Sequence, residues 1–254
     1  MKTVILAGGL GTRLSEETII KPKPMVEIGN KPIMLHIMNT YASYGYKEFI
    51  LALGYLGEIV KEYFLNYYYH QNNLTIDLKI GKTEVLNENC SDWKVHLIDT
   101  GLETMTGGRL FRLRDFLKGQ SFMLTYGDGV ANIDIKKLVA FHKAHGKVAT
   151  VTAVRPVARF GGIILEKEKV KDFKEKPQTV EGWINGGFFV FEPKIFDYLH
   201  SDTDVLEGEP MEKLVKDGQL MAYQHEGFWQ CMDTVRDKHN LENMWISGKA
   251  PWIK

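Results

Sequence analysis

Near its N-terminus the chain reads Val4-Ile5-Leu6-Ala7-Gly8-Gly9-Leu10-Gly11-Thr12-Arg13-Leu14. The first four residues form a short, partly β-branched apolar run, which predicts a buried strand. The run passes directly into a glycine-rich loop that carries a hydroxyl and a guanidinium. Glycines let backbone N–H groups approach an anion, and the arginine fork matches phosphate oxygens. The stretch therefore predicts a strand followed by a phosphate-binding loop, with a plain tight turn as the alternative.

The loop departs from two well-known phosphate-binding patterns. A Walker loop requires a lysine at a fixed spacing after its first glycine, and no lysine follows these glycines there. The dinucleotide fingerprint requires a third Gly or Ala where this chain has Leu14, and the second apolar run ends in Leu53-Gly54-Tyr55 without an acidic residue. Both departures disfavour a nicotinamide-dependent oxidoreductase.

Apolar runs and helical periodicities alternate along the first part of the chain. From about Phe160 the pattern changes to short strands with close turns, followed by helical stretches near residues 193–199, 209–216 and 233–245. We expect an α/β fold with a Rossmann-like, mostly parallel mixed sheet flanked by helices, and an α+β elaboration in the C-terminal half. The predicted strands of the first part are residues 4–7, 49–53, 95–98, 122–126 and 149–153, and the predicted helices cover residues 33–44, 59–67 and 135–142.

Composition limits the classes of function. The 32 Lys and Arg residues balance the 32 Asp and Glu residues, whereas a polynucleotide-binding protein is normally basic. The two cysteines, Cys90 and Cys231, form no CxxC pair, so we expect no disulfide framework or cysteine zinc site. No stretch approaches the roughly 18 apolar residues of a membrane span, and the first apolar run is too short for a signal peptide. We expect a cytoplasmic protein without nucleic-acid or membrane partners.

Three charged side chains stand out by their local setting. In Lys21-Pro22-Lys23-Pro24-Met25 the prolines stiffen the backbone, so Lys23 would project predictably beside phosphates unless it is an ordinary solvated lysine. Asp128 follows an apolar strand in Tyr126-Gly127-Asp128-Gly129, where an α/β sheet binds ligands. Asp233 offers a second carboxylate after a short strand. Each aspartate is either a Mg²⁺ ligand or the N-cap of a following helix.

Two later segments, residues 173–177 and 183–187, bring together a carboxylate, an ammonium and an amide. Polyhydroxylated ligands are bound by such groups, although each segment taken alone is better explained as a solvated turn. The eight histidines form no HxxH, HExxH or Ser-His-Asp pattern, which disfavours metalloprotease and hydrolase readings.

Taken together, these motifs resemble the sugar-nucleotidyltransferase (nucleotidyl-transferring pyrophosphorylase) family, and in particular its CTP-using branch. The chain has three residues between Trp229 and Asp233, where the Trp-Leu-Asp-Thr-Gly of the thymidylyl branch has one. The segments that carry the resemblance, in order along nearly the whole chain, are residues 6–14, 21–25, 105–110, 126–129, 159–161, 175–177, 185–190, 228–234 and 248–252.

The resemblance implies one nucleotidyltransferase domain over residues 1–254, with 1–155 mainly nucleotide-binding and 156–254 mainly sugar-phosphate-binding and helical. It also implies a role for each matching residue. Lys23 and Arg13 would be catalytic, and Asp128 and Asp233 would bind Mg²⁺. The residues implied to bind the nucleotide are Leu6, Ala7, Gly8, Gly9, Gly11, Thr12, Arg13, Thr104, Thr106 and Arg109, and those implied to bind the sugar phosphate are Lys23, Glu175, Lys176 and Asn185.

The implied reaction is Mg²⁺-dependent transfer of CMP from CTP to α-D-glucose 1-phosphate, giving CDP-glucose and pyrophosphate. The resemblance further implies a homo-oligomer that serves CDP-sugar synthesis for O-antigen lipopolysaccharide. A sugar phosphate is already a nucleophile at neutral pH, so the site needs positioning and charge neutralisation and no general base. The alternatives are a uridylyl- or thymidylyltransferase on a hexose 1-phosphate, or a non-catalytic nucleotide-sugar sensor, which the presence of Lys23, Asp128 and Asp233 disfavours.

For base choice the sequence suggests Arg109. Cytosine has an acceptor at N3 where uracil has a donor, and a guanidinium can only donate. We expect Arg109, or a backbone N–H that it positions beside Thr106, to face the O2/N3 edge of cytosine. The alternative is that Arg109 only packs at the start of a helix.

Overall fold

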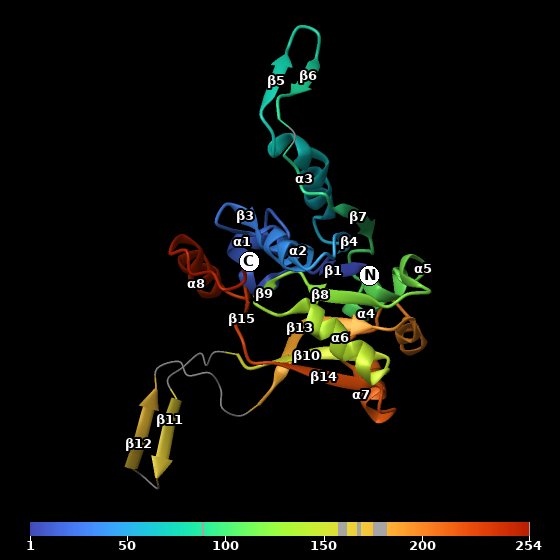
Figure 1. Ribbon diagram of the computed structural model, residues 1–254, viewed down its shortest axis with the longest axis vertical. Helices are drawn as coiled ribbons and strands as arrows, with labels where there is room; N and C mark the ends of the chain where they lie inside the picture. The colour runs from blue at the N-terminus through green and yellow to red at the C-terminus, as the bar shows by residue number, and fades with distance from the viewer. Residues whose placement is uncertain (88, 157–161, 167–168, 175–181, 254) are drawn as a thin grey trace.

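A seven-stranded mixed sheet forms the centre of the molecule, in the order β14-β10-β13-β8-β1-β4-β7 (Figure 1). The computed structural model describes residues 1–87, 89–156, 162–166, 169–174 and 182–253. In the sheet, β13 runs antiparallel to β8 and β10, and the other neighbours are parallel. This confirms the expected mostly parallel α/β fold. The strands are β1 (Thr3–Ala7), β4 (Glu48–Leu53), β7 (Lys94–Asp99), β8 (Phe122–Tyr126), β10 (Ala149–Val154), β13 (Ile184–Phe191) and β14 (Leu220–His225).

Helices cover both faces of this sheet, because successive side chains of a central strand point to opposite sides. Ile5 faces a core shared with α2 (Ile33–Ser43), α3 (Gly57–His70), α6 (Ile135–His145) and α8 (Val235–Ile246). Its neighbour Val4 faces a second core, formed with α4 (Thr106–Arg112), α5 (Arg114–Leu117), the 3-10 helix η3 (Pro193–Tyr198) and α7 (Glu209–Lys216). None of the helices that the structure describes is both long and apolar enough to pass through a bilayer.

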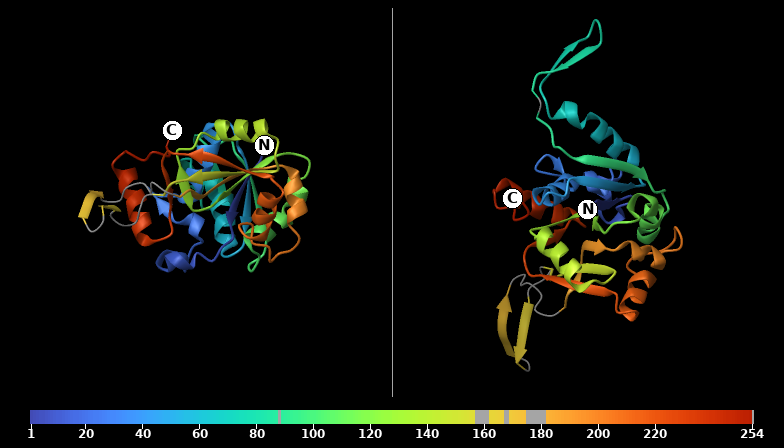
Figure 2. Two further views of the ribbon diagram at one scale, coloured as in Figure 1. Left: turned by 90° about the horizontal axis from the view of Figure 1, so that it is seen from below. Right: turned by 45° about the vertical axis from the view of Figure 1, so that its right-hand side comes forward.

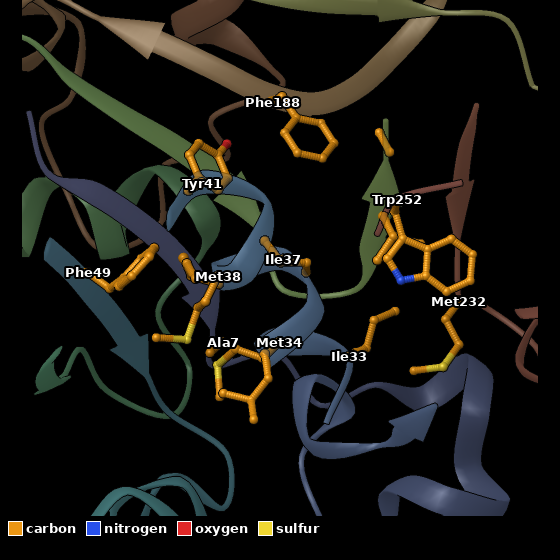
Figure 3. Close-up of a cluster of buried hydrophobic side chains, with 14 of the residues drawn as sticks. Ala7, Ile33, Met34, Ile37, Met38, Tyr41, Phe49, Phe188, Met232 and Trp252 are labelled. Carbon is orange, nitrogen blue, oxygen red and sulfur yellow. The ribbon is translucent and has the colours of Figure 1, made fainter. Parts of the chain in front are cut away.

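Helix α2 lies at the middle of the first core. Figure 3 shows its Ile33, Met34, Ile37, Met38 and Tyr41 between β1 and β4 on one side and Phe188, Met232 and Trp252 on the other. The core therefore joins the N-terminal strands to segments from the last part of the chain, and strands from both halves share one sheet.

The five strands predicted for the first part of the chain lie within β1, β4, β7, β8 and β10, and the three predicted helices overlap α2, α3 and α6. The stretch near 193–199 is a 3-10 helix, and the last helix begins at Val235. Strand β14 was not predicted from the sequence. Nor was the hairpin of β5 (Leu74–Asp77) and β6 (Lys82–Val85), which projects from the body after α3 (Figures 1 and 2). The remaining elements are η1 (Thr12–Leu14), α1 (Ser15–Thr18), η2 (Lys23–Met25), β2 (Glu27–Ile28), β3 (Lys31–Pro32), β9 (Gly129–Ala131), β15 (Trp229–Cys231) and the hairpin β11 (Gly162–Glu166)–β12 (Lys169–Lys174).

Candidate active site

A cavity of about 520 Å³ opens where the loops after β1 and β8 meet, at the carboxyl ends of these adjacent strands. Its volume is in the range of small-molecule sites, roughly 300–1,000 Å³. The structure brings all ten residues predicted to bind the nucleotide to this cavity, together with Lys23 and Asp128. The lining residues are Leu6, Ala7, Gly8, Gly9, Gly11, Thr12, Arg13, Lys23, Pro24, Thr104, Met105, Thr106, Arg109, Tyr126, Gly127, Asp128 and Glu207.

Lys23 is buried and joins two carboxylates at the cavity. Its Nζ donates to Asp128 Oδ2 at 2.5 Å and to Asp233 Oδ1 at 2.6 Å, and Arg13 Nη1 donates to Asp233 Oδ2 at 2.6 Å. Burial by itself opposes the charge of Lys23, but the two aspartates outweigh this effect and raise its pKa. Burial likewise opposes the charge of Asp233, whereas Lys23 and Arg13 lower its pKa. Lys23 and Asp233 are therefore both held in their charged forms. Lys23 is not an ordinary solvated side chain.

Neither aspartate caps a helix. Asp128 is followed by β9, and the N-cap of the next helix is Asp134, which accepts from the backbone N–H of Lys137 at 3.0 Å. After Asp233, the N-cap of α8 is Thr234, which forms a capping box with Asp237. The capping alternative is thus wrong for both residues. Their carboxylates are left to face the cavity cations.

The two carboxylates converge on a single cationic atom, the Nζ of Lys23. Carboxylate oxygens are the ligands that Mg²⁺ prefers, and one or two of them are typically enough when phosphates and water complete the coordination. In the described part of the chain, no group of three or more His, Cys, Asp or Glu residues is arranged to hold a metal. Asp128 and Asp233 are the two residues at this point whose oxygens could hold a Mg²⁺ ion.

Arg109 is 4% exposed, and both of its terminal nitrogens are engaged by the protein. Nη1 donates to the carbonyls of Leu53 and Gly101 and to Thr100 Oγ1, and Nη2 donates to the carbonyls of Gly8 and Leu102, over 2.7–3.2 Å. A Cβ at Gly8 would lie 2.3 Å from Nη1, so only glycine fits there. The prediction offered two possibilities, that Arg109 donates directly to cytosine or that it positions a backbone N–H that does so. This geometry favours the second possibility.

Three residues at the site were not assigned a role from the sequence. Tyr126 donates its hydroxyl to Glu207 Oε1, and Glu207 Oε2 accepts from Thr106 Oγ1 at 2.6 Å. Burial and the nearby Glu207 raise the pKa of Tyr126, which keeps the phenol protonated. Trp229 donates its indole N–H to the Gly186 carbonyl at 2.7 Å. Tyr126 and Trp229 stand in motifs quoted above, whereas no local signal marks Glu207, which a distant loop carries to the cavity.

The predicted sugar-phosphate residues are placed only in part. Asn185 lies at the start of β13, and its Nδ2 donates to the Tyr126 hydroxyl at 2.9 Å. Glu175 and Lys176 lie outside the described residues. The structure thus brings the Asn185 side of the predicted sugar site next to the nucleotide loops.

Comparisons with known proteins identify the family of this chain. The chain belongs to the nucleotidyl transferase family, whose model, "Nucleotidyl transferase", matches residues 2–238. This confirms the resemblance inferred from the motifs.

Full-length relatives narrow the class. A Salmonella typhi protein named "Glucose-1-phosphate cytidylyltransferase" is 53% identical over 253 residues, covering 99% of this chain and 98% of that protein. A Bacillus subtilis (strain 168) protein named "Probable glucose-1-phosphate cytidylyltransferase" is 46% identical over 253 residues, covering 99% of each. The crystal structure of HddC from Yersinia pseudotuberculosis matches with a TM-score of 0.70 at 23% identity, covering 96% of this chain and 99% of that one, which shows the fold alone.

The contacts of Arg109 lead to a stability prediction. Arg109→Met removes five hydrogen bonds that a largely buried guanidinium donates. The carbonyls of Leu53 and Gly8 keep the backbone N–H groups of Thr100 and Tyr55 as donors, whereas those of Gly101 and Leu102 lose the Arg109 donor. At about 0.5–1.5 kcal/mol net for each lost bond, we expect the free energy of unfolding to fall by about 3 kcal/mol. Arg112→Met is the matched control, because Arg112 pairs with Asp202 on the exposed surface. That change should cost less than about 1 kcal/mol. Urea unfolding followed by tryptophan fluorescence measures both, and equal losses would contradict the interpretation.

Proposed function

We propose that this chain transfers CMP from CTP to α-D-glucose 1-phosphate, forming CDP-glucose and pyrophosphate. The observation that carries the proposal is the buried Lys23, held by two carboxylates beside a glycine-rich loop at the carboxyl end of β1. The full-length identity of 53% to a protein named for this activity supports the choice of substrates.

The reaction needs little covalent chemistry from the protein. An oxygen of the sugar phosphate attacks the α-phosphorus of CTP, the bond from that phosphorus to the bridging oxygen breaks, and pyrophosphate leaves with the electron pair. Two anions must approach each other, so cations that neutralise their charge lower the barrier. Lys23 supplies a buried cation, and the largely exposed Arg13 presents a planar fork to the leaving pyrophosphate.

We also propose that Mg²⁺ is the cofactor, with Asp128 and Asp233 as its protein ligands. When bound, the ion would supply charge neutralisation for the phosphates. Lys23 and Arg13 share Asp233, so the residues that hold the metal also set the positions of both cations.

A pyrophosphate-release assay with glucose 1-phosphate tests the proposed function directly. CTP should give the highest kcat/KM among CTP, UTP, dTTP, ATP and GTP. A higher value with UTP or dTTP would assign the chain to the uridylyl- or thymidylyltransferase alternative. Absence of release with every nucleotide, despite nucleotide binding, would support the sensor alternative.

Loss of either carboxylate should stop turnover. Asp128→Asn and Asp233→Asn each remove an anionic group that would hold the metal, so we expect kcat to fall at least about 100-fold. Asp115→Asn, at an exposed ion pair with Lys118, is the control and should leave kcat unchanged. Circular dichroism checks that each variant is folded. Near-native rates of both site variants in excess Mg²⁺ would exclude the two-aspartate assignment.

We further propose that the chain forms a homo-oligomer through the β5–β6 hairpin. This projecting hairpin exposes Ile76 at 54%, Leu78 at 90% and Ile80 at 68%. An isolated two-stranded hairpin is marginally stable in water, and adjacent exposed apolar side chains mark interaction sites. A second copy is the occupant we propose, because a formal net charge of zero gives little repulsion between copies.

The hairpin proposal predicts a change of mass. The double variant Leu78→Asp/Ile80→Asp places two charges in the contact and should shift the wild-type oligomer toward the monomer in sedimentation velocity. Ile246→Asp, at an exposed position of α8, is the control and should leave the mass unchanged. A monomeric wild type, or an unchanged mass of the double variant, would contradict the proposal.

The two cysteines are free thiols, which fits a reducing compartment. We therefore propose that the enzyme is cytoplasmic. We also propose, from the resemblance to its family, that it supplies CDP-glucose for CDP-sugar synthesis, including that of O-antigen lipopolysaccharide.

A further inference from the structure

A chain of hydrogen bonds crosses the cavity from the nucleotide loops to the predicted sugar side. The backbone N–H of Leu206 donates to Thr106 Oγ1 at 2.9 Å, and Thr106 Oγ1 donates to one oxygen of Glu207. The other oxygen of Glu207 accepts from the Tyr126 hydroxyl, which in turn accepts from Asn185 Nδ2. Asn185 Oδ1 accepts from the backbone N–H of Gly187 at 2.8 Å.

The direction of each bond follows from the chemistry of the groups. An ionised carboxylate only accepts, so the single hydroxyl proton of Tyr126 is directed to Glu207. The phenol oxygen can then only accept from Asn185, which requires the amide nitrogen, and not the amide oxygen, to face it. A flipped amide would place Oδ1 against the phenol oxygen and Nδ2 against the N–H of Gly187. Both contacts would be repulsive, so Glu207 and Tyr126 fix one orientation of the Asn185 amide.

The backbone around Asn185 is built for this arrangement. Gly187 has a φ of +77°, and a Cβ there would lie 2.4 Å from Cδ2 of Tyr126. The Tyr126 ring thus occupies space that any other residue at 187 would fill. Trp229 holds the intervening Gly186 carbonyl. The segment that carries Asn185 therefore packs against Tyr126, the last residue of β8, which precedes Asp128 by two residues.

We propose that Tyr126 and Glu207 are positioning residues for the sugar phosphate. They fix the Asn185 amide so that its second N–H, which has no acceptor among the described residues, can donate to an oxygen of glucose 1-phosphate. This inference rests on the proposed function. It adds that recognition of the sugar phosphate depends on a phenol and a carboxylate that need not touch it.

The test compares the two substrates in one variant. Tyr126→Phe keeps the ring but removes the hydroxyl that orients the amide, so the KM for glucose 1-phosphate should rise about tenfold, as expected for one lost hydrogen bond of about 1.4 kcal/mol. The KM for CTP should stay within about twofold. The control is Tyr198→Phe, which removes another tyrosine hydroxyl bonded to a carboxylate, that of Asp217, outside the site. This control should change neither KM.

A double-mutant cycle shows whether Tyr126 acts through Asn185. In an Asn185→Ala background, Tyr126→Phe should raise the KM for glucose 1-phosphate no further, because the amide that it orients is gone. Additive effects, or equal changes in both KM values, would overturn the proposal. The wild-type assay separates the two hypotheses, since an inactive wild type contradicts the proposed function, whereas an active wild type with an unaffected Tyr126→Phe contradicts only the positioning role.

Discussion

The contact of Lys23 with Asp128 and Asp233 is the interaction on which the site depends. It joins three segments, because Lys23 lies 105 residues from one aspartate and 210 from the other. Burying such charges costs several kcal/mol per ion, and a well-packed apolar cluster would stabilise the fold at least as well. The cluster is therefore poorly explained as a source of stability. It is well explained as a set of charges kept in place for phosphate chemistry.

Much of the framework could be predicted from local sequence. The apolar runs of β1, β4 and β8 and the glycine-rich loop after β1 are patterns of neighbouring residues, and the structure has them at those positions. The capping box of α8 was also visible, because Thr234-x-x-Asp237 has the required spacing and would have excluded Asp233 as the cap. The projecting β5–β6 hairpin was missed although Leu74, Ile76, Leu78 and Ile80 alternate with polar residues, a pattern that predicts a strand. The structure leaves Ile76, Leu78 and Ile80 exposed, so here the alternation does not mark a buried face.

Residues joined by long-range contacts could not be predicted. Arg109 was expected to face cytosine because a guanidinium can donate hydrogen bonds. In the structure its N–H groups donate instead to the carbonyls of Gly8, Leu53, Gly101 and Leu102, which only the folded loops bring together. Glu207 had no signal at all, since its partners Thr106 and Tyr126 are 101 and 81 residues away. A carbonyl that accepts from a guanidinium repels an anion less, so Arg109 still prepares the loop for phosphate.

The antiparallel strand in the sheet explains why the two halves of the site meet. Strand β13 pairs with β8 so that Phe188 lies opposite Thr125, and the start of β13 therefore lies at the carboxyl end of β8. Asn185 is brought there beside Tyr126, and Asp128 follows on the same edge. If β13 ran parallel to β8, Asn185 would lie at the amino end of β8 instead. That end is about 17 Å from the carboxyl end, which is the length of a five-residue strand. The mixed topology, and not a local motif, thus places the predicted sugar side next to the phosphate loop.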